Sequence, residues 1–338
     1  MNVWLFLLAC QPIEEDNTLE PLEFYKELQD TSEPSESTTP IDELETENEC
    51  LSNLDQNLSD GFGEHFLEWL NNSQYNRDFE RSDLSGGSFG GFVSDVDCIK
   101  KTPIIFVHGN SDRAYGGIYG GFEELTNSLK EQGYRSSELY ATTYGSALVQ
   151  DSPFYSHSQE NIAQVRQFIK AVLEYTGSQK VHVISHSLGV TMARKAIMGG
   201  VGIDDDGVGY DLGNPLTSSI DAFIGIAGAN QGLVNCLGAF TPICSTDNGL
   251  YPGSTVTDPS TFLQNINSQS GYEGSRVYSL WSVADEIILY GCVVGNQNTC
   301  RIPDQDGEKQ YYTMGHFQLK NQTGDVIFDM LQNTYVEE

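Results

Sequence analysis

Segments with the apolar pattern of strands alternate with segments that have the apolar spacing of helices from about residue 100 onward. The strand-like segments lie at residues 101–109, 138–144, 180–185, 219–227 and 276–282. The helix-like segments lie at residues 121–132, 161–175, 188–199 and 324–332. Apolar strands that alternate with helices are typical of a parallel sheet covered on both faces. The pattern predicts an α/β fold with about six strands in a compact, mostly parallel sheet.

Two long stretches rich in Gly, Asn, Ser and Pro interrupt this alternation at residues 201–218 and 229–274. Loops of that length are uncommon in a compact domain unless they have a function. We expect residues 229–274 to form a cap-like loop over a substrate site. Some apolar side chains of this loop either line the inner side of the cap or pack against the core. They are Leu233, Leu237, Phe240, Ile243 and Leu250.

The first sixty residues differ in composition from the rest of the chain. Residues 11–60 hold 16 acidic residues and one lysine, Lys26, together with abundant Ser, Thr and Pro. Such a segment cannot bury enough apolar surface to offset its ordering entropy, so we predict an acidic disordered linker. Residues 61–338 are numerous enough to form one catalytic domain with a full-sized core.

An apolar segment that ends at Cys10 begins the sequence. Residues 1–10 read Met-Asn-Val-Trp-Leu-Phe-Leu-Leu-Ala-Cys, and the last four resemble a bacterial lipobox. Lipidation of Cys10 would make residues 11–60 a tether between a membrane and the enzyme. The segment is short and has no basic residue before it, unlike an ordinary export signal. We expect an extracellular protein or a cell-surface lipoprotein of the bacterial outer envelope.

The cysteine count favours the same location. The chain has seven cysteines, and six remain after Cys10, enough for three disulfides in an oxidising compartment. Several connectivities stay open, because sequence alone does not decide among them. The most local choice is Cys50–Cys98, Cys236–Cys244 and Cys292–Cys300. The spacing of Cys and His matches no common metal motif, so we expect no metal site.

Ser187 follows the strand-like segment at 180–185 and has a small residue two positions before it, Ser185, and two positions after it, Gly189. Residues 181–190 read Val-His-Val-Ile-Ser-His-Ser-Leu-Gly-Val, and a helical pattern follows Ser187. A strand, a sharp turn and a helix expose a serine hydroxyl above a sheet as a nucleophile. The usual pattern is G-x-S-x-G, and here Ser185 replaces the first glycine. We predict that Ser187 is a catalytic nucleophile.

A serine nucleophile needs a base and a carboxylate that orients the base. In α/β proteins that present a nucleophilic serine on such a strand–turn–helix, the residues follow one another along the chain in the order serine, acid, histidine. Of the six histidines, only His316 follows Ser187, in a loop before the last helix, so we predict that His316 is the base. Asp285 follows the strand-like segment 276–282 and is the favoured acid. Three other acids stay open, and they are Glu286, Asp304 and Asp306.

The oxyanion formed during ester cleavage needs two backbone N–H donors. One is expected from Leu188, which follows the nucleophile. The other is expected from Asn110, in the His-Gly-Asn turn that ends the strand-like segment 101–109. Gly109 would let the backbone approach the substrate closely.

Several motifs together resemble the lipase class 2 family. The most telling are Pro-Ile-Ile-Phe-Val-His-Gly-Asn-Ser at 103–111 and Ile-Ser-His-Ser-Leu-Gly at 184–189. Further similar segments lie at 138–145, 224–233 and 282–286. The resemblance implies an α/β-hydrolase fold, secreted ester hydrolysis with triacylglycerols as typical substrates, and no cofactor. It assigns the triad to Ser187, Asp285 and His316, and it implies that serine is tolerated at position 185.

The sequence therefore predicts a serine ester hydrolase, most simply a lipase that cleaves acylglycerols at an interface. An extracellular polyester (polyhydroxyalkanoate) depolymerase or a short-chain carboxylesterase would use the same residues. The alternative outside the enzymes is a surface-binding protein that has the hydrolase fold but no catalytic activity. A net charge of −31 without a basic run argues against a nucleic-acid partner. The acidic stretch Asp204, Asp205, Asp206 and Asp211 could bind calcium or form an exposed loop, and the oligomeric state is left open.

Overall fold

The computed structural model describes residues 58–75, 77–255 and 257–337. The lipobox-like segment with Cys10, most of the acidic segment and the Cys50–Cys98 pairing lie outside these residues. Two disulfides, Cys236–Cys244 and Cys292–Cys300, join cysteines that both lie within the described residues. In the described part, no helix is long and apolar enough to cross a membrane.

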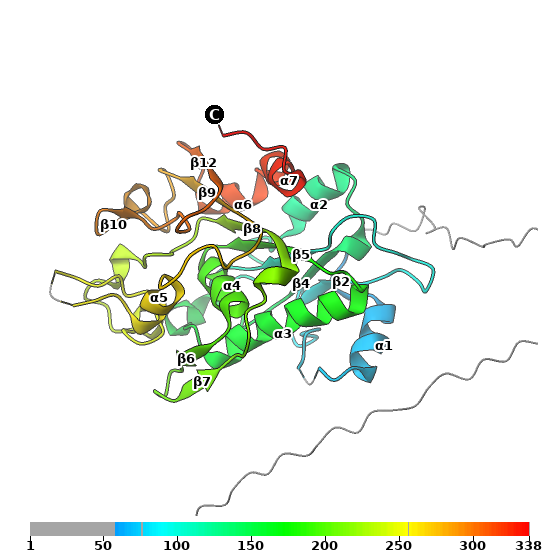
Figure 1. Cartoon of the computed structure of the whole chain (residues 1–338), viewed down its shortest axis with the longest axis horizontal. Coiled ribbons are helices and arrows are strands. Elements are labelled where there is room, and N and C mark those ends of the chain that lie inside the picture. Colours follow the sequence, from blue (N-terminus) through cyan, green and yellow to red (C-terminus); the bar gives the residue numbers. More distant parts are fainter. Residues whose placement is uncertain (1–57, 76, 256, 338) are drawn as a thin grey trace, which may run out of the picture. The chain divides into compact units, whose positions relative to one another are not determined.

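An eight-stranded sheet with the order β1-β2-β4-β3-β5-β8-β9-β12 forms the centre of the molecule (Figure 1). Its strands are β1 (Gly61–Phe62), β2 (Ser88–Gly90), β3 (Ile104–Val107), β4 (Leu139–Thr142), β5 (Val181–His186), β8 (Ile220–Ile226), β9 (Arg276–Ser282) and β12 (Gly307–Tyr311). Only the β2–β4 pairing is antiparallel within this sheet. The prediction of a mostly parallel sheet is confirmed, and the sheet has two more strands than expected.

Helices pack on both faces of the sheet. The helices are α1 (Glu64–Asn72), α2 (Glu123–Glu131), α3 (Gln159–Thr176), α4 (Leu188–Met198), α5 (Thr261–Ile266), α6 (His316–Asn321) and α7 (Gly324–Gln332). In Figure 1, α3 and α4 lie side by side near the centre, whereas α2, α6 and α7 gather at the top.

Alternate residues of the central strands point into two separate cores. Ile105 and Val107 of β3 pack in one core, together with Phe168 of α3 and Met192 of α4. Their neighbours in β3 point the other way, into a second core. That core also contains Leu125 of α2, Ile327 of α7 and Ile224 of β8. Because the side chains of a strand alternate in direction, an uninterrupted apolar run serves both faces.

The long loops contain short elements that the sequence pattern did not predict. Residues 201–218 form an antiparallel hairpin of β6 (Val201–Ile203) and β7 (Gly209–Asp211). Residues 229–274 contain α5. Farther along the chain, a second small hairpin pairs β10 (Val293–Val294) with β11 (Gln297–Asn298). The described part of the chain also has six 3₁₀ turns, η1 (Ser136–Glu138), η2 (Val149–Phe154), η3 (Thr217–Ser219), η4 (Val234–Cys236), η5 (Pro242–Cys244) and η6 (Tyr290–Cys292).

Candidate active site

Ser187 occupies a strained turn between β5 and α4. Its backbone has φ 56° and ψ −127°, a conformation that non-glycine residues rarely adopt. The N–H of Ser187 donates to the carbonyl of Ile226 in the neighbouring strand at 2.8 Å, which holds the turn against the sheet. Ser187 is partly exposed whereas both its neighbours are buried. This geometry is that of a nucleophile elbow.

Close packing explains which residues around the elbow must be small. A Cβ atom at Gly189 would lie 2.3 Å from the carbonyl oxygen of His108. A Cβ atom at Gly109 would lie 2.9 Å from that of Ser187. Ser185, by contrast, lies fully buried in β5, where its hydroxyl donates to the carbonyl of Ile224 at 3.3 Å. The turn therefore requires glycine at 189 and accommodates serine at 185.

His316 and Asp285 form a buried hydrogen-bonded pair. Nδ1 of His316 lies 2.7 Å from Oδ2 of Asp285, and both side chains are almost completely buried. The other carboxylate oxygen accepts the backbone N–H groups of Ile287 at 2.9 Å and Ile288 at 2.8 Å. Burial alone would raise the pKa of Asp285, but the bonds from His316, Ile288 and Ile287 hold that pKa below its usual value. The acid is thus a charged, fixed partner for the imidazole.

The other candidate acids have different partners. Glu286 accepts the backbone N–H of His316 at 2.9 Å, so it holds the start of α6 rather than the imidazole ring. Asp306 accepts the N–H of Val277 at 2.7 Å near the amino end of β9, and Asp304 accepts the hydroxyl of Ser270. Asp285 follows the carboxyl end of the same strand. The structure therefore brings only Asp285, of these four acids, to the ring of His316.

His316 begins the six-residue helix α6, although the sequence suggested a loop. Its ring lies 4.5 Å from that of His186, the neighbour of Ser187, and Nε2 of His186 donates to the carbonyl of His316 at 3.2 Å. Among the described residues, no hydrogen bond joins the hydroxyl of Ser187 to His316. Such catalytic bonds are often long without substrate and tighten only in the complex.

The two backbone N–H groups expected to bind an oxyanion have no acceptor among the described residues. Leu188 begins α4, and Asn110 lies in the turn after β3. The side chain of Asn110 is otherwise engaged, because its Nδ2 donates to the carbonyl of Ser152 at 2.9 Å and its Oδ1 accepts the hydroxyl of Ser111 at 2.8 Å. The side chain of Asn110 is therefore held in the turn, whereas its backbone N–H has no acceptor among the described residues.

His108 is a structural residue of this turn that sequence reasoning did not single out. The N–H of Tyr144 donates to Nε2 of His108 at 3.0 Å, so the ring proton is on Nδ1, which donates to the carbonyl of Gly109 at 2.8 Å. Burial lowers the pKa of His108 to about 4 and keeps the ring neutral. His108 and Tyr144 follow two strands, β3 and β4, that pair in parallel, so their rings stack. Predicting that these two strands are neighbours would have been needed to foresee the hydrogen bonds of His108.

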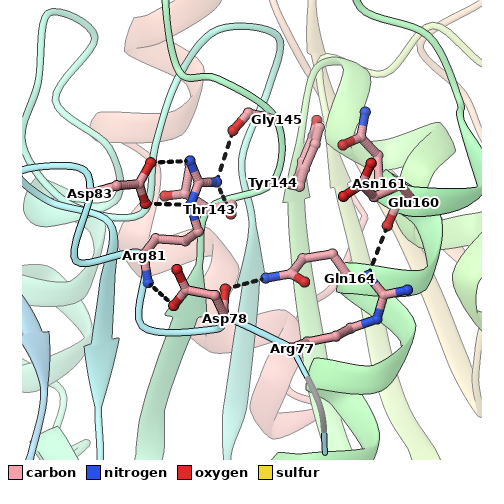
Figure 2. A pocket seen from close by; sticks show the side chains of 10 residues that line it. All are labelled: Arg77, Asp78, Arg81, Asp83, Thr143, Tyr144, Gly145, Glu160, Asn161 and Gln164. Carbon is pink, nitrogen blue, oxygen red and sulfur yellow. Dashed lines mark hydrogen bonds and ion pairs between the residues drawn. The ribbon is translucent and has the colours of Figure 1, made fainter.

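A polar groove of about 710 Å³ lies beside the end of β4 (Figure 2). Figure 2 shows the guanidinium of Arg81 against the carboxylate of Asp83, and the same group donates to the carbonyls of Thr143 and Gly145. Tyr144, which stacks on His108, also lines the groove. The guanidinium of Arg81 therefore makes four hydrogen bonds to protein groups.

The acidic stretch in the β6–β7 hairpin is engaged with neighbouring loops. Asp205 accepts Ser156 at 2.7 Å and Asn248 at 2.6 Å, and Asp204 accepts the N–H of Gln159 at 3.0 Å. The described residues contain no group of three or more His, Cys, Asp or Glu side chains that could hold a metal ion.

The mostly parallel sheet, the serine in a strained elbow and a late histidine, His316 at the start of α6, are those of an α/β-hydrolase. The model of the family Lipase (class 2) matches residues 101–329, more than half of the chain. The chain therefore belongs to the lipase class 2 family of ester hydrolases.

A solved lipase structure shows the same fold at low sequence identity. The chain is 16% identical to Aspergillus fumigatus lipase B, with a TM-score of 0.50, over 75% of this chain and 57% of that one. It is 14% identical to the mature form of Bacillus licheniformis lipase BlEst2, with a TM-score of 0.49, over 73% and 98% of the two chains. The matched region thus spans little more than half of the Aspergillus lipase.

Proposed function

We propose that this protein is a serine ester hydrolase in which Ser187 is the nucleophile, His316 the base and Asp285 the acid that orients the base. The observation that carries the proposal is the buried 2.7 Å bond between Asp285 and His316, whose ring lies 4.5 Å from that of His186, the residue before the serine of the strained elbow. Family membership supports ester hydrolysis as the reaction.

The pair determines which ring nitrogen of His316 can take a proton. Because Nδ1–H donates to Asp285, Nε2 carries a lone pair and accepts the proton of Ser187 as the serine oxygen attacks the ester carbonyl. The protonated imidazole then returns this proton to the leaving alcohol, which leaves an acyl-serine. A water molecule, deprotonated by the same nitrogen, then attacks the acyl carbon. The bond from this carbon to the serine oxygen breaks, the imidazolium returns the proton to that oxygen, and the carboxylic acid leaves.

The N–H groups of Asn110 and Leu188 would stabilise the negative oxygen of both tetrahedral intermediates. Loss of one such donor costs about 3–4 kcal/mol of transition-state stabilisation in related chemistry. His108 supports this role because its Nδ1–H binds the carbonyl of Gly109, which belongs to the same planar peptide as the N–H of Asn110.

Exposed apolar side chains on the segments that follow the strands of the sheet support a lipid ester as substrate. Most of the exposed large apolar side chains of the described residues follow the carboxyl ends of strands. These are Ile118, Leu148, Val149, Phe154, Leu237, Phe240, Val283, Ile287, Tyr290, Val293 and Tyr312. Carboxyl ends of parallel strands meet at one edge of a sheet, which is the edge that holds Ser187. Exposed apolar groups on the segments that follow this edge fit contact with aggregated acylglycerols rather than with a soluble ester.

The remaining parts of the proposal concern the location of the protein. Two disulfides support an oxidising compartment. We extend the proposal to a secreted or surface-tethered enzyme, in which residues 1–10 form the export segment, Cys10 carries the lipid and residues 11–60 connect it to the catalytic domain. Metabolic labelling with a fatty-acid analogue tests this part, because a Cys10→Ser variant should lose the label.

Reaction with a fluorophosphonate probe tests the proposed nucleophile. We expect the wild-type protein to be labelled and the Ser187→Ala variant to be unlabelled and inactive on p-nitrophenyl butyrate, with unchanged thermal unfolding. The matched control is Ser185→Ala, which changes a buried serine two positions before Ser187. This variant should still be labelled. Activity of Ser187→Ala near the wild-type level would disprove the assignment.

The substrate class needs a separate measurement. We expect a triacylglycerol emulsion to be hydrolysed faster than its monomeric short-chain analogue, and p-nitrophenyl esters to be preferred as the acyl chain lengthens. Exclusive cleavage of acetyl esters would instead indicate a short-chain carboxylesterase. Depolymerisation of a polyester film without activity on the emulsion would indicate a polyester hydrolase.

A further inference from the structure

A buried ion pair joins the turn after β3, residues 108–112, to the helix that carries His316. We call this segment the oxyanion turn because it contains the N–H of Asn110. Nζ of Lys320 lies 2.7 Å from Oδ2 of Asp112, and their side chains have exposed fractions of 0% and 2%. Nζ also donates to the carbonyl of Tyr119 at 3.1 Å. The two charged residues are 208 positions apart in the sequence, so only the fold brings them together.

Asp112 completes the turn that presents the N–H of Asn110. The N–H of Asp112 donates to the carbonyl of Gly109 at 3.2 Å, and its Oδ1 accepts the N–H of Arg113 at 2.9 Å. The carbonyl of Gly109 also accepts Nδ1–H of His108. Since the peptide between Gly109 and Asn110 is planar, two donors on its carbonyl oxygen determine where the N–H on its other side points.

Lys320 lies one helical turn after His316 on α6. The same helix contacts the segment after the oxyanion turn a second time, because the ring of Phe317 stacks on that of Tyr119 at 4.6 Å with an interplanar angle of 5°. The base and the oxyanion turn are thus connected through Lys320, Asp112 and this aromatic pair. No contact between the ion pair and Ser187 is involved.

Stability alone is a weak reason for this pair. Removing two charges from water costs several kcal/mol per ion, and well-packed apolar residues of similar size often give equal or greater stability. Burial accordingly lowers the pKa of Lys320, and Asp112 opposes that shift. What an ion pair provides and an apolar contact does not is a short, directional connection at one distance.

We propose that Asp112 and Lys320 are positioning residues, which hold the N–H of Asn110 at the distance from His316 that the transition state requires. The inference rests on the proposed function, and neither side chain touches the substrate. A displacement of about 1 Å at a reacting centre can cost about 10²-fold in rate. Loss of the pair should therefore lower kcat and leave KM nearly unchanged, because the ground-state ester does not yet carry the negative oxygen.

The test compares variants that remove the pair with a control pair elsewhere. Lys320→Met leaves a buried carboxylate alone, whereas the double variant Asp112→Asn, Lys320→Met leaves no buried charge. Arg135→Met is the matched control. Arg135 is bound to Asp97 in another largely buried ion pair, with side-chain exposures of 10% and 0%. Arg135 precedes β4, at the opposite end of that strand from the oxyanion turn.

We expect both Lys320 variants to lose about 10- to 100-fold in kcat on p-nitrophenyl butyrate, with KM changed less than about threefold. Affinity for a trifluoromethyl ketone, which forms an oxyanion on the serine, should fall by the same factor as kcat. Arg135→Met should lower the midpoint of thermal unfolding and keep kcat. The double variant should recover stability relative to Lys320→Met without recovering kcat.

Wild-type kcat in the folded double variant would overturn the inference, as would an equal kcat loss in Arg135→Met. If the double variant does not fold, Asp112→Glu replaces it, because it keeps both charges and lengthens the connection by one methylene. Wild-type kcat in that variant would equally contradict the inference. Failure of the proposed function would look different, since the wild-type protein itself would neither cleave the ester nor react with a fluorophosphonate.

Discussion

Replacement of Asp285 by asparagine gives a specific test of the role of this acid. In the structure one carboxylate oxygen accepts two backbone N–H groups, from Ile287 and Ile288, and the other faces Nδ1 of His316 at 2.7 Å. The amide oxygen of an asparagine would take the place facing the two N–H donors. Its NH₂ group, which can only donate, would then face His316.

The consequence is a change of tautomer rather than a loss of shape. A donor opposite Nδ1 forces that nitrogen to present its lone pair, so the neutral ring carries its proton on Nε2. That nitrogen then cannot accept the proton of Ser187. The same substitution lowers kcat by about 10⁴-fold in a serine protease with this triad, which equals about 5.4 kcal/mol at room temperature. We expect a loss of that order here.

Glu286→Gln is the matched control because Glu286 is the adjacent acid. Its exposed side chain accepts the backbone N–H of His316, and a glutamine oxygen can accept that bond equally well. We expect less than about a threefold change in kcat. The assay is initial-rate hydrolysis of p-nitrophenyl butyrate at mildly alkaline pH, with urea unfolding of each variant to confirm that it is folded. Asp285→Asn with more than about a tenth of wild-type kcat would refute the assignment, as would an equal loss in Glu286→Gln.

Two further predictions concern stability. A Gly189→Ala substitution places a Cβ atom 2.3 Å from a carbonyl oxygen, so it should cost at least about 2 kcal/mol of unfolding free energy and reduce activity. Gly209→Ala meets nothing closer than 3.8 Å and should cost less than about 0.5 kcal/mol in the same urea titration. Burial lowers the pKa values of His108 and His157 from 6.5 to about 4. The unfolded chain therefore binds more protons below pH 6.5, and the unfolding free energy should fall by about 3 kcal/mol per histidine as the pH drops toward 4. A stability that does not change with pH across this window would contradict the burial of these neutral rings.

The core strands and the longer helices were predictable because their signals are local. A central parallel strand is apolar on both faces, and a surface helix repeats its apolar positions every three to four residues. The last helix, α7, matches the predicted range, residues 324–332, at both ends. Strand β12 escaped prediction because its sequence, Gly-Glu-Lys-Gln-Tyr, is polar and half-buried at the edge of the sheet. Strand β1 has only two residues, too few to show a period.

The sequence by itself determined the order of the site, because a serine between small residues and one later histidine left few combinations open. It could not decide between Asp285 and Glu286, which are adjacent. The turn after β9 decides which of the two carboxylates faces the imidazole and which binds the backbone. The tautomer of His108 and the Asp112–Lys320 pair also depend on tertiary structure. Each joins segments that are distant in sequence, and such contacts arise only when the parallel strands bring their carboxyl ends to one edge.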